Sequence, residues 1–219
     1  MRTRGPSPVC AGFDTISLTN LGSRQAIGVG ISTELTQIAA ALAEELGAPV
    51  AFRCADVLEV GGIEGEADLV CTGKGAVHWM FDLPAGAAKV AQILRPGGWL
   101  FLFDFHLMMW LFRDGPEGIE VNPVSYFAPI IKYRDWAPGH FVGRELPVPE
   151  GGALKRLRPW PPGAVIQSLI GAGLELRIFH EYPDSLAEDW TAYPRATTEE
   201  RARIASTYAV MACKPEDHP

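Results

Sequence analysis

The sequence has no apolar run that approaches the roughly 20 residues needed to cross a bilayer. Its first residues, MRTRGPSP, lack the apolar core that a secretory signal requires. Cysteine is scarce, and the cysteines lie far apart, without the paired spacing of a metal site or a disulfide framework. We therefore expect a cytoplasmic protein with no membrane partner and no bound metal. Its cysteines are expected to be buried, reduced thiols: Cys10, Cys54, Cys71 and Cys213.

Positive charge is scarce as well. The chain has 19 Lys and Arg residues against 26 Asp and Glu residues, a net charge of -7 and a pI of about 5.2. The basic residues are scattered rather than gathered into a patch, so nucleic acid is not an expected partner. With 219 residues and a hydrophobic content of 47%, the chain can build one sizeable core. We expect a single domain over residues 1–219.

The sequence does have a regular alternation of short apolar runs and helical patterns in its first half, typical of a parallel sheet with crossover helices. Strands are expected at 25–31, 50–54, 68–71, 99–105, 174–180 and 208–213. The runs at 68–71 and 99–105 are continuously apolar, as a sheet covered on both faces requires. The pattern predicts an α/β fold, doubly wound around a mostly parallel sheet.

Three helices are expected between these strands. The first follows Ser32, a good N-cap, and ends at Gly47. The second is opened by Pro84, and the third covers residues 162–173. On the first helix, the apolar residues that recur at helical spacing are expected to share one face: Leu35, Ile38, Ala39, Leu42 and Leu46.

Both periodicities fade between residues 107 and 162, where aromatic residues are interleaved with Pro and Gly. We interpret residues 107–162 as an inserted segment packed over the carboxyl ends of the strands. In an open α/β sheet, ligands bind outside those ends. The strand ends that are expected to converge there are residues 10–14, 30–32, 54–57, 71–75 and 104–106.

Three stretches carry a family resemblance. They read Arg53-Cys54-Ala55-Asp56-Val57, then ADLVCTGKGAVHW from residue 67, then LRPGGWLFLFDFH from residue 94. This order of strand, polar tip, helix and Pro-Gly-Gly turn resembles the class I S-adenosylmethionine-dependent methyltransferases. The resemblance covers nearly all of residues 10–213. It implies a Rossmann-like fold, S-adenosylmethionine as cofactor and a small molecule as methyl acceptor.

The resemblance also implies cofactor contacts at the strand ends. Gly12 is what remains of the glycine-rich loop that lets the backbone approach the cofactor's amino-acid moiety. Gly30, followed by Ile31, stands where the family has an acid that binds both ribose hydroxyls, which implies weaker binding here. Asp56 matches the acceptor for the adenine amino group, with Val57 packing on the ring. The alternative for Asp56 is a helix or turn cap.

Further site residues are implied on the substrate side. Thr72 and Gly73 match positions that the family places at the reacting methyl group. His106 is a candidate general base, because imidazole titrates near neutral pH. The alternative is a histidine hydrogen-bonded within its own strand-end loop. His78 is interpreted as a packed or capping residue. Residues 180–182 (His-Glu-Tyr) are interpreted as a solvated strand end, and the alternative is a polar cluster that faces the substrate.

The first strand of the family fold, which is central there, has only residues 7–10 to form it, and prolines occupy positions 6 and 8. This short N-terminus and Gly30 leave three hypotheses open. The first is a methyltransferase acting on a small molecule. The second is a degenerate member that binds the cofactor weakly, or that binds or cyclises a small molecule without methyl transfer. The third is a partner-binding module whose sheet is completed by another chain, as in a homodimer.

Overall fold

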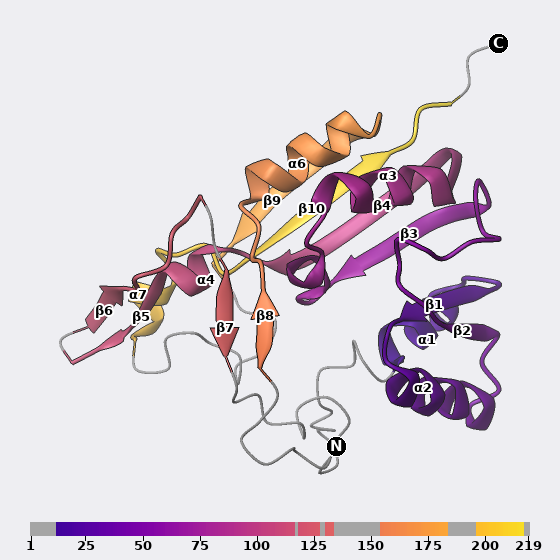
Figure 1. The fold of residues 1–219 in the computed structure, drawn as a ribbon, viewed down its shortest axis with the longest axis horizontal. Helices are drawn as coiled ribbons and strands as arrows, with labels where there is room; N and C mark the ends of the chain where they lie inside the picture. The colour runs from indigo at the N-terminus through magenta and orange to yellow at the C-terminus, as the bar shows by residue number, and fades with distance from the viewer. Residues whose placement is uncertain (1–11, 117, 128–129, 134–153, 184–195, 217–219) are drawn as a thin grey trace. The chain divides into compact units, whose positions relative to one another are not determined.

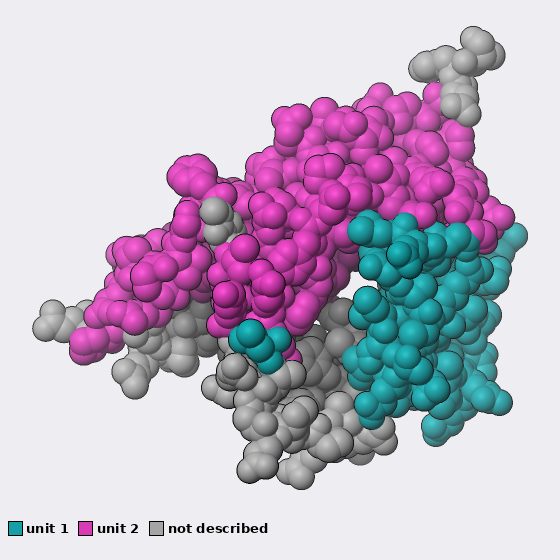
Figure 2. All heavy atoms as spheres, viewed as in Figure 1, with its two compact units in different colours: residues 1–61, 133–154 teal, residues 62–132, 155–219 magenta. Residues whose placement is uncertain are grey.

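The computed structural model describes residues 12–116, 118–127, 130–133, 154–183 and 196–216. The chain forms two compact units (Figure 2): unit 1 comprises residues 1–61 and 133–154, and unit 2 comprises residues 62–132 and 155–219. Each unit has its own sheet. The single domain expected over the whole chain stays a prediction, and the expected first strand at 7–10 lies outside the described residues.

Unit 1 is a βαβ unit preceded by a short helix (Figure 1). Helix α1 (Phe13–Asn20) leads into β1 (Ala26–Gly30), then α2 (Thr33–Glu45) and β2 (Val50–Cys54). The two strands pair in parallel from Ala26↔Val50 to Gly30↔Cys54. Both strands and α2 are confirmed where they were expected, whereas α1 was not predicted.

The predicted ends of α2 are also confirmed. The Ser32 hydroxyl accepts a hydrogen bond from the Leu35 N–H at 3.3 Å and caps the first turn. At the other end Gly47 has a left-handed φ of 62°, and its N–H donates to the Glu44 carbonyl. Leu46 is 58% exposed, because the helix ends at Glu45 and Leu46 already belongs to the cap.

The core of unit 1 contains several small residues, besides Ile16 and Val60, and one partly buried aromatic ring. Gly12, Gly28 and Ala39 are all buried, and the Phe52 ring lies against both glycines. A Cβ added at Gly28 would meet Phe52 ring carbons at 2.4 and 2.5 Å. The ring therefore occupies the space that larger side chains at these positions would need.

Unit 2 has a four-stranded sheet in the order β3-β4-β10-β9. Its strands are β3 (Ala67–Gly73), β4 (Leu94–Phe105), β9 (Glu175–Tyr182) and β10 (Thr207–Cys213). β3 and β4 are parallel, and β10 runs antiparallel to both of its neighbours, so β9 points the same way as β3 and β4. β10 is thus the single reversed strand of this four-stranded sheet, and β1 and β2 are parallel, which confirms the mostly parallel α/β fold.

Helices α3 (Leu83–Ile93) and α6 (Pro162–Gly171) cover one face of this sheet. Asp82 caps α3 by accepting from the Ala85 N–H at 3.0 Å, close to Pro84 in the first turn. The core beneath them is aliphatic with one tyrosine: Val77, Leu83, Ala87, Leu94, Leu100, Leu102, Val165, Leu169, Leu174, Tyr208, Val210 and Ala212.

The opposite face of the unit 2 sheet corrects the expectation of strands covered on both faces. β4 alternates, with Leu100 and Leu102 buried and Phe101 exposed between them. In the neighbouring strand Leu69 is 47% exposed. The continuously apolar sequence therefore predicted the strands correctly but not their burial on both faces. The expected burial of the thiols is likewise wrong for Cys54 and Cys71, which are exposed, while Cys213 is buried.

The segment after β4 contains more regular structure than its fading periodicity suggested. Short elements follow each other there: α4 (Met108–Leu111), β5 (Phe112–Gly115), β6 (Gly118–Val121), β7 (Ile131–Tyr133) and β8 (Lys155–Leu157). β5 pairs with β6 in an antiparallel hairpin, and β7 pairs with β8. Its packing over the strand ends stays a prediction.

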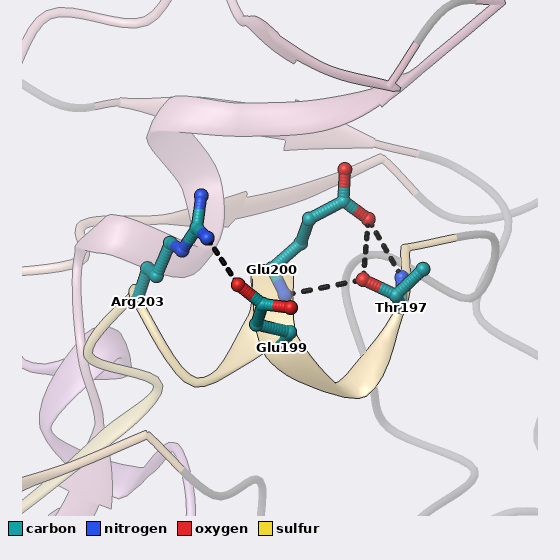
Figure 3. A network of polar contacts seen from close by, with 4 residues as sticks. All are labelled: Thr197, Glu199, Glu200 and Arg203. Carbon is teal, nitrogen blue, oxygen red and sulfur yellow. Dashed lines mark hydrogen bonds and ion pairs between the residues drawn. The ribbon is translucent and has the colours of Figure 1, made fainter.

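The four-residue helix α7 (Thr198–Arg201) leads back into β10 and is held by a capping box (Figure 3). The Thr197 hydroxyl accepts from the Glu200 N–H at 3.2 Å, and the Glu200 carboxylate accepts from the Thr197 N–H at 2.8 Å. Arg203 forms an ion pair with Glu199 on the same turn. Within the described ranges, no helix is long and apolar enough to cross a membrane.

Candidate functional site

The carboxyl ends of β1 and β2 lie side by side in unit 1. The Ala55 N–H donates to the Gly30 carbonyl at 3.0 Å, directly after the last strand pair. Ile31 follows Gly30 with 77% of its surface exposed, and Val57 is also exposed. Four of the predicted cofactor residues, Gly30, Ile31, Asp56 and Val57, thus belong to the same end of this small sheet.

Gly30 is open toward solvent. Among the described residues, a Cβ added there would meet the Thr36 hydroxyl oxygen alone, at 3.6 Å, which is ordinary van der Waals contact. Its backbone lies outside the left-handed region, so a side chain is sterically allowed. The absence of an acid at this position is therefore not imposed by packing.

Asp56 follows β2 and caps a turn. Its Oδ1 accepts a hydrogen bond from the Leu58 N–H at 2.9 Å, and its carbonyl accepts from the Glu59 and Val60 N–H groups at 3.0 Å. This is the turn-capping geometry considered as the alternative role. The cap uses one carboxylate oxygen, and the residue is exposed, so the adenine role stays a prediction.

The backbone conformation and the packing around residue 12 both require glycine. It is the N-cap of α1 with a φ of 82°, a conformation that L side chains rarely adopt. An added Cβ would lie 2.6 Å from the Phe52 ring and 2.7 Å from the Ala39 Cβ. Close internal packing therefore accounts for this glycine without a ligand, and its cofactor role stays a prediction.

In unit 2, Thr72 and Gly73 end β3 beside β4. A Cβ added at Gly73 would lie 1.9 Å from the Phe103 carbonyl oxygen, so only glycine allows the two strands to approach this closely. The next residue, Lys74, has a left-handed φ of 55°, and its N–H donates to the same carbonyl at 2.9 Å. The loop that carries these two residues is therefore fixed against β4.

His106 lies just after β4 and is buried. Its Nδ1 accepts from the Met108 N–H at 3.0 Å, so the proton of the neutral ring is on Nε2, which lies 2.9 Å from the Glu181 carboxylate. Burial lowers the pKa of His106, and the Glu181 charge opposes that shift. Both ring nitrogens are thus engaged, as in the strand-end alternative, and the general-base role stays a prediction.

Glu181 was missed as a partner. Residues 180–182, interpreted as a solvated strand end, are indeed exposed, and Glu181 in addition binds the buried His106. The sequence gives no signal for this pair, because the two residues are 75 positions apart and meet only through the pairing of β9 with β10.

His78 is packed, as expected. It lies in the 3-10 helix η1 (Ala76–Trp79), is buried, and its Nε2 is 3.2 Å from the Phe105 carbonyl oxygen. Burial lowers the pKa of His78, which keeps the ring neutral, and a neutral ring donates to that carbonyl through Nε2.

A second buried group, the Tyr208 hydroxyl, has no hydrogen-bond partner in the part of the chain that the structure describes. Burial and the nearby Asp104 charge raise the pKa of this phenol.

Residues 9–98 match a family model described as a methyltransferase domain. This range includes α1 through β3 and the start of β4. A stretch of 55 residues is 40% identical to the biotin biosynthesis bifunctional protein BioCD of Bordetella avium. That stretch is 25% of this chain and 12% of the relative, so the chain matches only a small part of that protein.

Solved structures share the fold over almost the whole chain. An S-adenosylmethionine-dependent methyltransferase from Mesorhizobium loti superposes with a TM-score of 0.66 at 18% identity, covering 94% of this chain and 88% of that chain. The [4+2]-cyclase SpnF superposes with a TM-score of 0.60 at 17% identity, covering 95% of this chain and 74% of that chain. At such identities the likeness concerns the fold. Together with the methyltransferase domain matched over residues 9–98, it confirms the Rossmann-like fold of the class I S-adenosylmethionine-dependent methyltransferases.

Proposed function

We propose that this protein binds S-adenosylmethionine and transfers its methyl group to a small-molecule acceptor. The observation that carries the proposal is the exposed apolar surface at the strand ends of unit 1, where Ile31 is 77% exposed and Val57 is also exposed, beside the Asp56 carboxylate. An exposed isoleucine next to a polar turn is what a flat, partly polar ring such as adenine can cover.

The residues of unit 1 fit the adenosine part of the ligand. Ile31 and Val57 offer apolar surface for the ring, and the Asp56 carboxylate has an oxygen besides the one that binds the Leu58 N–H. Gly30 offers space but no carboxylate for the ribose hydroxyls. The expected affinity is therefore lower than in a family member with an acid there, by roughly one to two decades.

The bound cofactor would supply a methyl group that is already electrophilic, so the protein has mainly to align the acceptor with it. Thr72 and Gly73, on a loop of unit 2 that is fixed against β4, are proposed as residues of the methyl-transfer site, as the family resemblance implies. If the acceptor must lose a proton, His106 is the proposed base. The Met108 contact would have to open first, because Nε2 carries the ring proton and the lone pair of Nδ1 is engaged by the Met108 N–H.

Calorimetric titration with S-adenosylmethionine and with its demethylated product tests the proposal. We expect binding in the micromolar range or somewhat weaker. Ile31→Ser should weaken it by roughly tenfold, because apolar surface is lost under the ring. Leu46→Ser is the matched control, an equally apolar residue of unit 1 that is 58% exposed and follows α2. No binding at millimolar cofactor would end the proposal, and equal losses in both variants would remove Ile31 from the site.

We propose a small, flat or apolar molecule as acceptor, held by the aromatic residues of the segment after β4. In the described part of that segment these include Trp110, Tyr126 and Phe127. Trp136 and Phe141, which belong to the same expectation, lie outside the described residues. A panel of aromatic and aliphatic acceptors with radiolabelled cofactor would test this. Transfer only to a macromolecule would contradict it.

A second candidate is a family member that binds a small molecule, or cyclises it, without methyl transfer. Gly30 favours it, because the position has room for an acid and carries none. The fold likeness to a cyclase fits the same candidate. Methyl transfer to any member of the acceptor panel would exclude it. Cofactor binding without transfer to any acceptor would favour it.

We also propose that a second copy of the chain is a partner and that the protein is cytoplasmic. Apolar residues on the uncovered face of the unit 2 sheet, such as Phe101 and Leu69, support self-association. Light scattering during size-exclusion chromatography tests the first point, and a monomer at micromolar concentration would contradict it. Cell fractionation tests the second.

A further inference from the structure

Asp104 is a carboxylate that the fold buries completely at the end of β4. Within the described ranges, the donors to this carboxylate are all backbone N–H groups. Oδ1 accepts from Gly75 at 2.5 Å and from Phe105 at 2.7 Å, and Oδ2 accepts from Val77 at 3.1 Å. Among the described residues, no Lys or Arg forms an ion pair with it. Since a buried carboxylate is costly unless its oxygens are satisfied, these three donors are what stabilise the charge.

Two of the three donors, Gly75 and Val77, lie in the turn that follows β3 and in the first residues of η1. Lys74 and Gly75 are both left-handed, with φ of 55° and 93°. A non-glycine residue in that region is disfavoured and persists only where its surroundings hold it. The Gly75 and Val77 N–H groups lie at the start of η1, where the helix itself offers them no acceptor. The Asp104 carboxylate therefore satisfies the donors of a turn that has no regular structure of its own.

The third donor ties this turn to the strand end that carries His106. The Phe105 N–H binds the carboxylate, and the Phe105 carbonyl accepts from the His78 ring at 3.2 Å. The His106 N–H in turn donates to the Ser206 carbonyl at 2.8 Å. One buried carboxylate thus joins the end of β3, η1 and the end of β4.

We propose that Asp104 is a positioning residue, which holds the Thr72–Gly75 loop and the His106 segment in one fixed arrangement for the methyl end of the ligand. The ligand part of this inference rests on the proposed function. The structural part does not, because it concerns the backbone of the unliganded protein.

Asp104→Asn tests the structural part. The amide keeps the shape of the side chain but loses its charge, and its NH2 group cannot accept a hydrogen bond. Asp68→Asn is the matched control, an exposed carboxylate on β3 that pairs with Arg95. In hydrogen exchange of the unliganded protein, the amides of Gly75 and Val77 should exchange at least about tenfold faster in Asp104→Asn and unchanged in the control.

The ligand part needs a comparison between two molecules. Asp104→Asn should weaken S-adenosylmethionine by roughly tenfold and leave adenosine almost unchanged, because adenosine lacks the methionine and methyl end. A general loss of structure would weaken both. Asp104→Glu, which keeps the charge, should recover part of the exchange protection and part of the affinity.

The outcomes separate the two proposals. If the wild-type protein binds no cofactor, the proposed function fails, while hydrogen exchange still decides what Asp104 holds. Unchanged exchange at Gly75 and Val77 in Asp104→Asn would overturn the positioning role. Equal weakening of adenosine and S-adenosylmethionine binding would also overturn the positioning role. Loss of the whole fold in both the Asn and the Glu variant would overturn it as well, because either result would mean that Asp104 serves folding alone.

Discussion

The two units of this chain build their cores differently. Unit 1 packs two parallel strands and two helices around Phe52, with glycine and alanine as its neighbours. Unit 2 packs four strands against two helices with leucine and valine between them. A buried leucine contributes about 1.5–3 kcal/mol and an alanine much less. Unit 1 therefore has less hydrophobic burial to hold it, although its strand ends carry the exposed residues proposed to bind adenosine.

The difference separates the surface that is proposed to bind the ligand from the part of the fold with the larger hydrophobic core. Ligand-binding segments are commonly drawn from the less stable part of a protein. In unit 1 the exposed Ile31 and Val57 contribute little to the core and are available to a ligand. In unit 2 the predicted site residues, such as Gly73 and His106, are held by hydrogen bonds and close packing.

The largest expected effect follows from truncating the core of unit 2. Leu100→Ala removes a fully buried side chain of β4 and should lower the free energy of unfolding by about 2–5 kcal/mol. The control is Leu69→Ala in the adjacent strand, 47% exposed, for which less than about 1 kcal/mol is expected. Urea unfolding measures both. Similar losses would show that the exposed face of the sheet is as tightly packed as the covered one.

The next effect probes the small-residue core of unit 1. Gly28→Ala places a Cβ 2.4 Å from the Phe52 ring and should cost about 1–3 kcal/mol. Gly30→Ala, two residues further along the same strand, meets only the Thr36 hydroxyl at 3.6 Å and should change stability by less than about 0.5 kcal/mol. Hydrogen exchange of the β1 and β2 amides measures both. The Phe52→Leu background should relieve the Gly28→Ala defect, and its persistence there would contradict the packing account.

Much of the architecture could be predicted from the sequence. β2 was predicted residue for residue, because Val50–Cys54 is an apolar run between a helix end and an acidic turn. α1 was missed because its sequence, FDTISLTN, has no apolar stripe and buries only Ile16. Burial of β3 and β4 on both faces was overpredicted, since a continuous apolar run does not show how many faces are covered.

In the candidate site, too, some features could be predicted from the sequence and others could not. Strand ends are visible in the amino-acid sequence, so Gly30, Asp56 and Thr72 could be assigned to them from their positions alone. Their hydrogen-bond partners could not. The contact of His106 with Glu181 depends on the register of two antiparallel pairings far along the chain, which no local pattern encodes.

Gly30 in unit 1 has room for a side chain, so a substitution there can test for a gain in cofactor affinity. Gly30→Asp should raise the affinity for S-adenosylmethionine by roughly ten- to hundredfold, because a carboxylate can bind the ribose hydroxyls. Gly30→Asn is the control: it fills the same space without the charge and should give a smaller gain. Calorimetry measures both. Unchanged affinity in the Asp variant would mean that position 30 does not face the ribose.

The smallest expected effect concerns acid sensitivity, which should belong to unit 2. Burial lowers the pKa of both His78 and His106 below the ordinary value of 6.5, and residues 12–61 contain no histidine. Below about pH 6.5 the unfolded chain therefore binds more protons than the folded one. The stability contributed by neutral, buried histidines is full above this pH and is lost as the pH falls toward the lowered pKa values. Unit 2 should accordingly lose exchange protection at pH 5.5 before the described part of unit 1 does.

Glu181→Gln tests the contribution of His106 to this acid sensitivity. The Glu181 charge raises the pKa of His106 against the effect of burial, so its removal should lower that pKa further and steepen the loss of stability in acid. Glu181 is half-exposed, so the added loss at pH 5.5 should stay below about 1 kcal/mol. Glu175→Gln on the same strand is the control, since Glu175 pairs with Arg177 rather than with a histidine. A shallower pH dependence in Glu181→Gln would mean that His106 carries its proton in the folded protein, and that the neutral ring inferred from its two contacts is wrong.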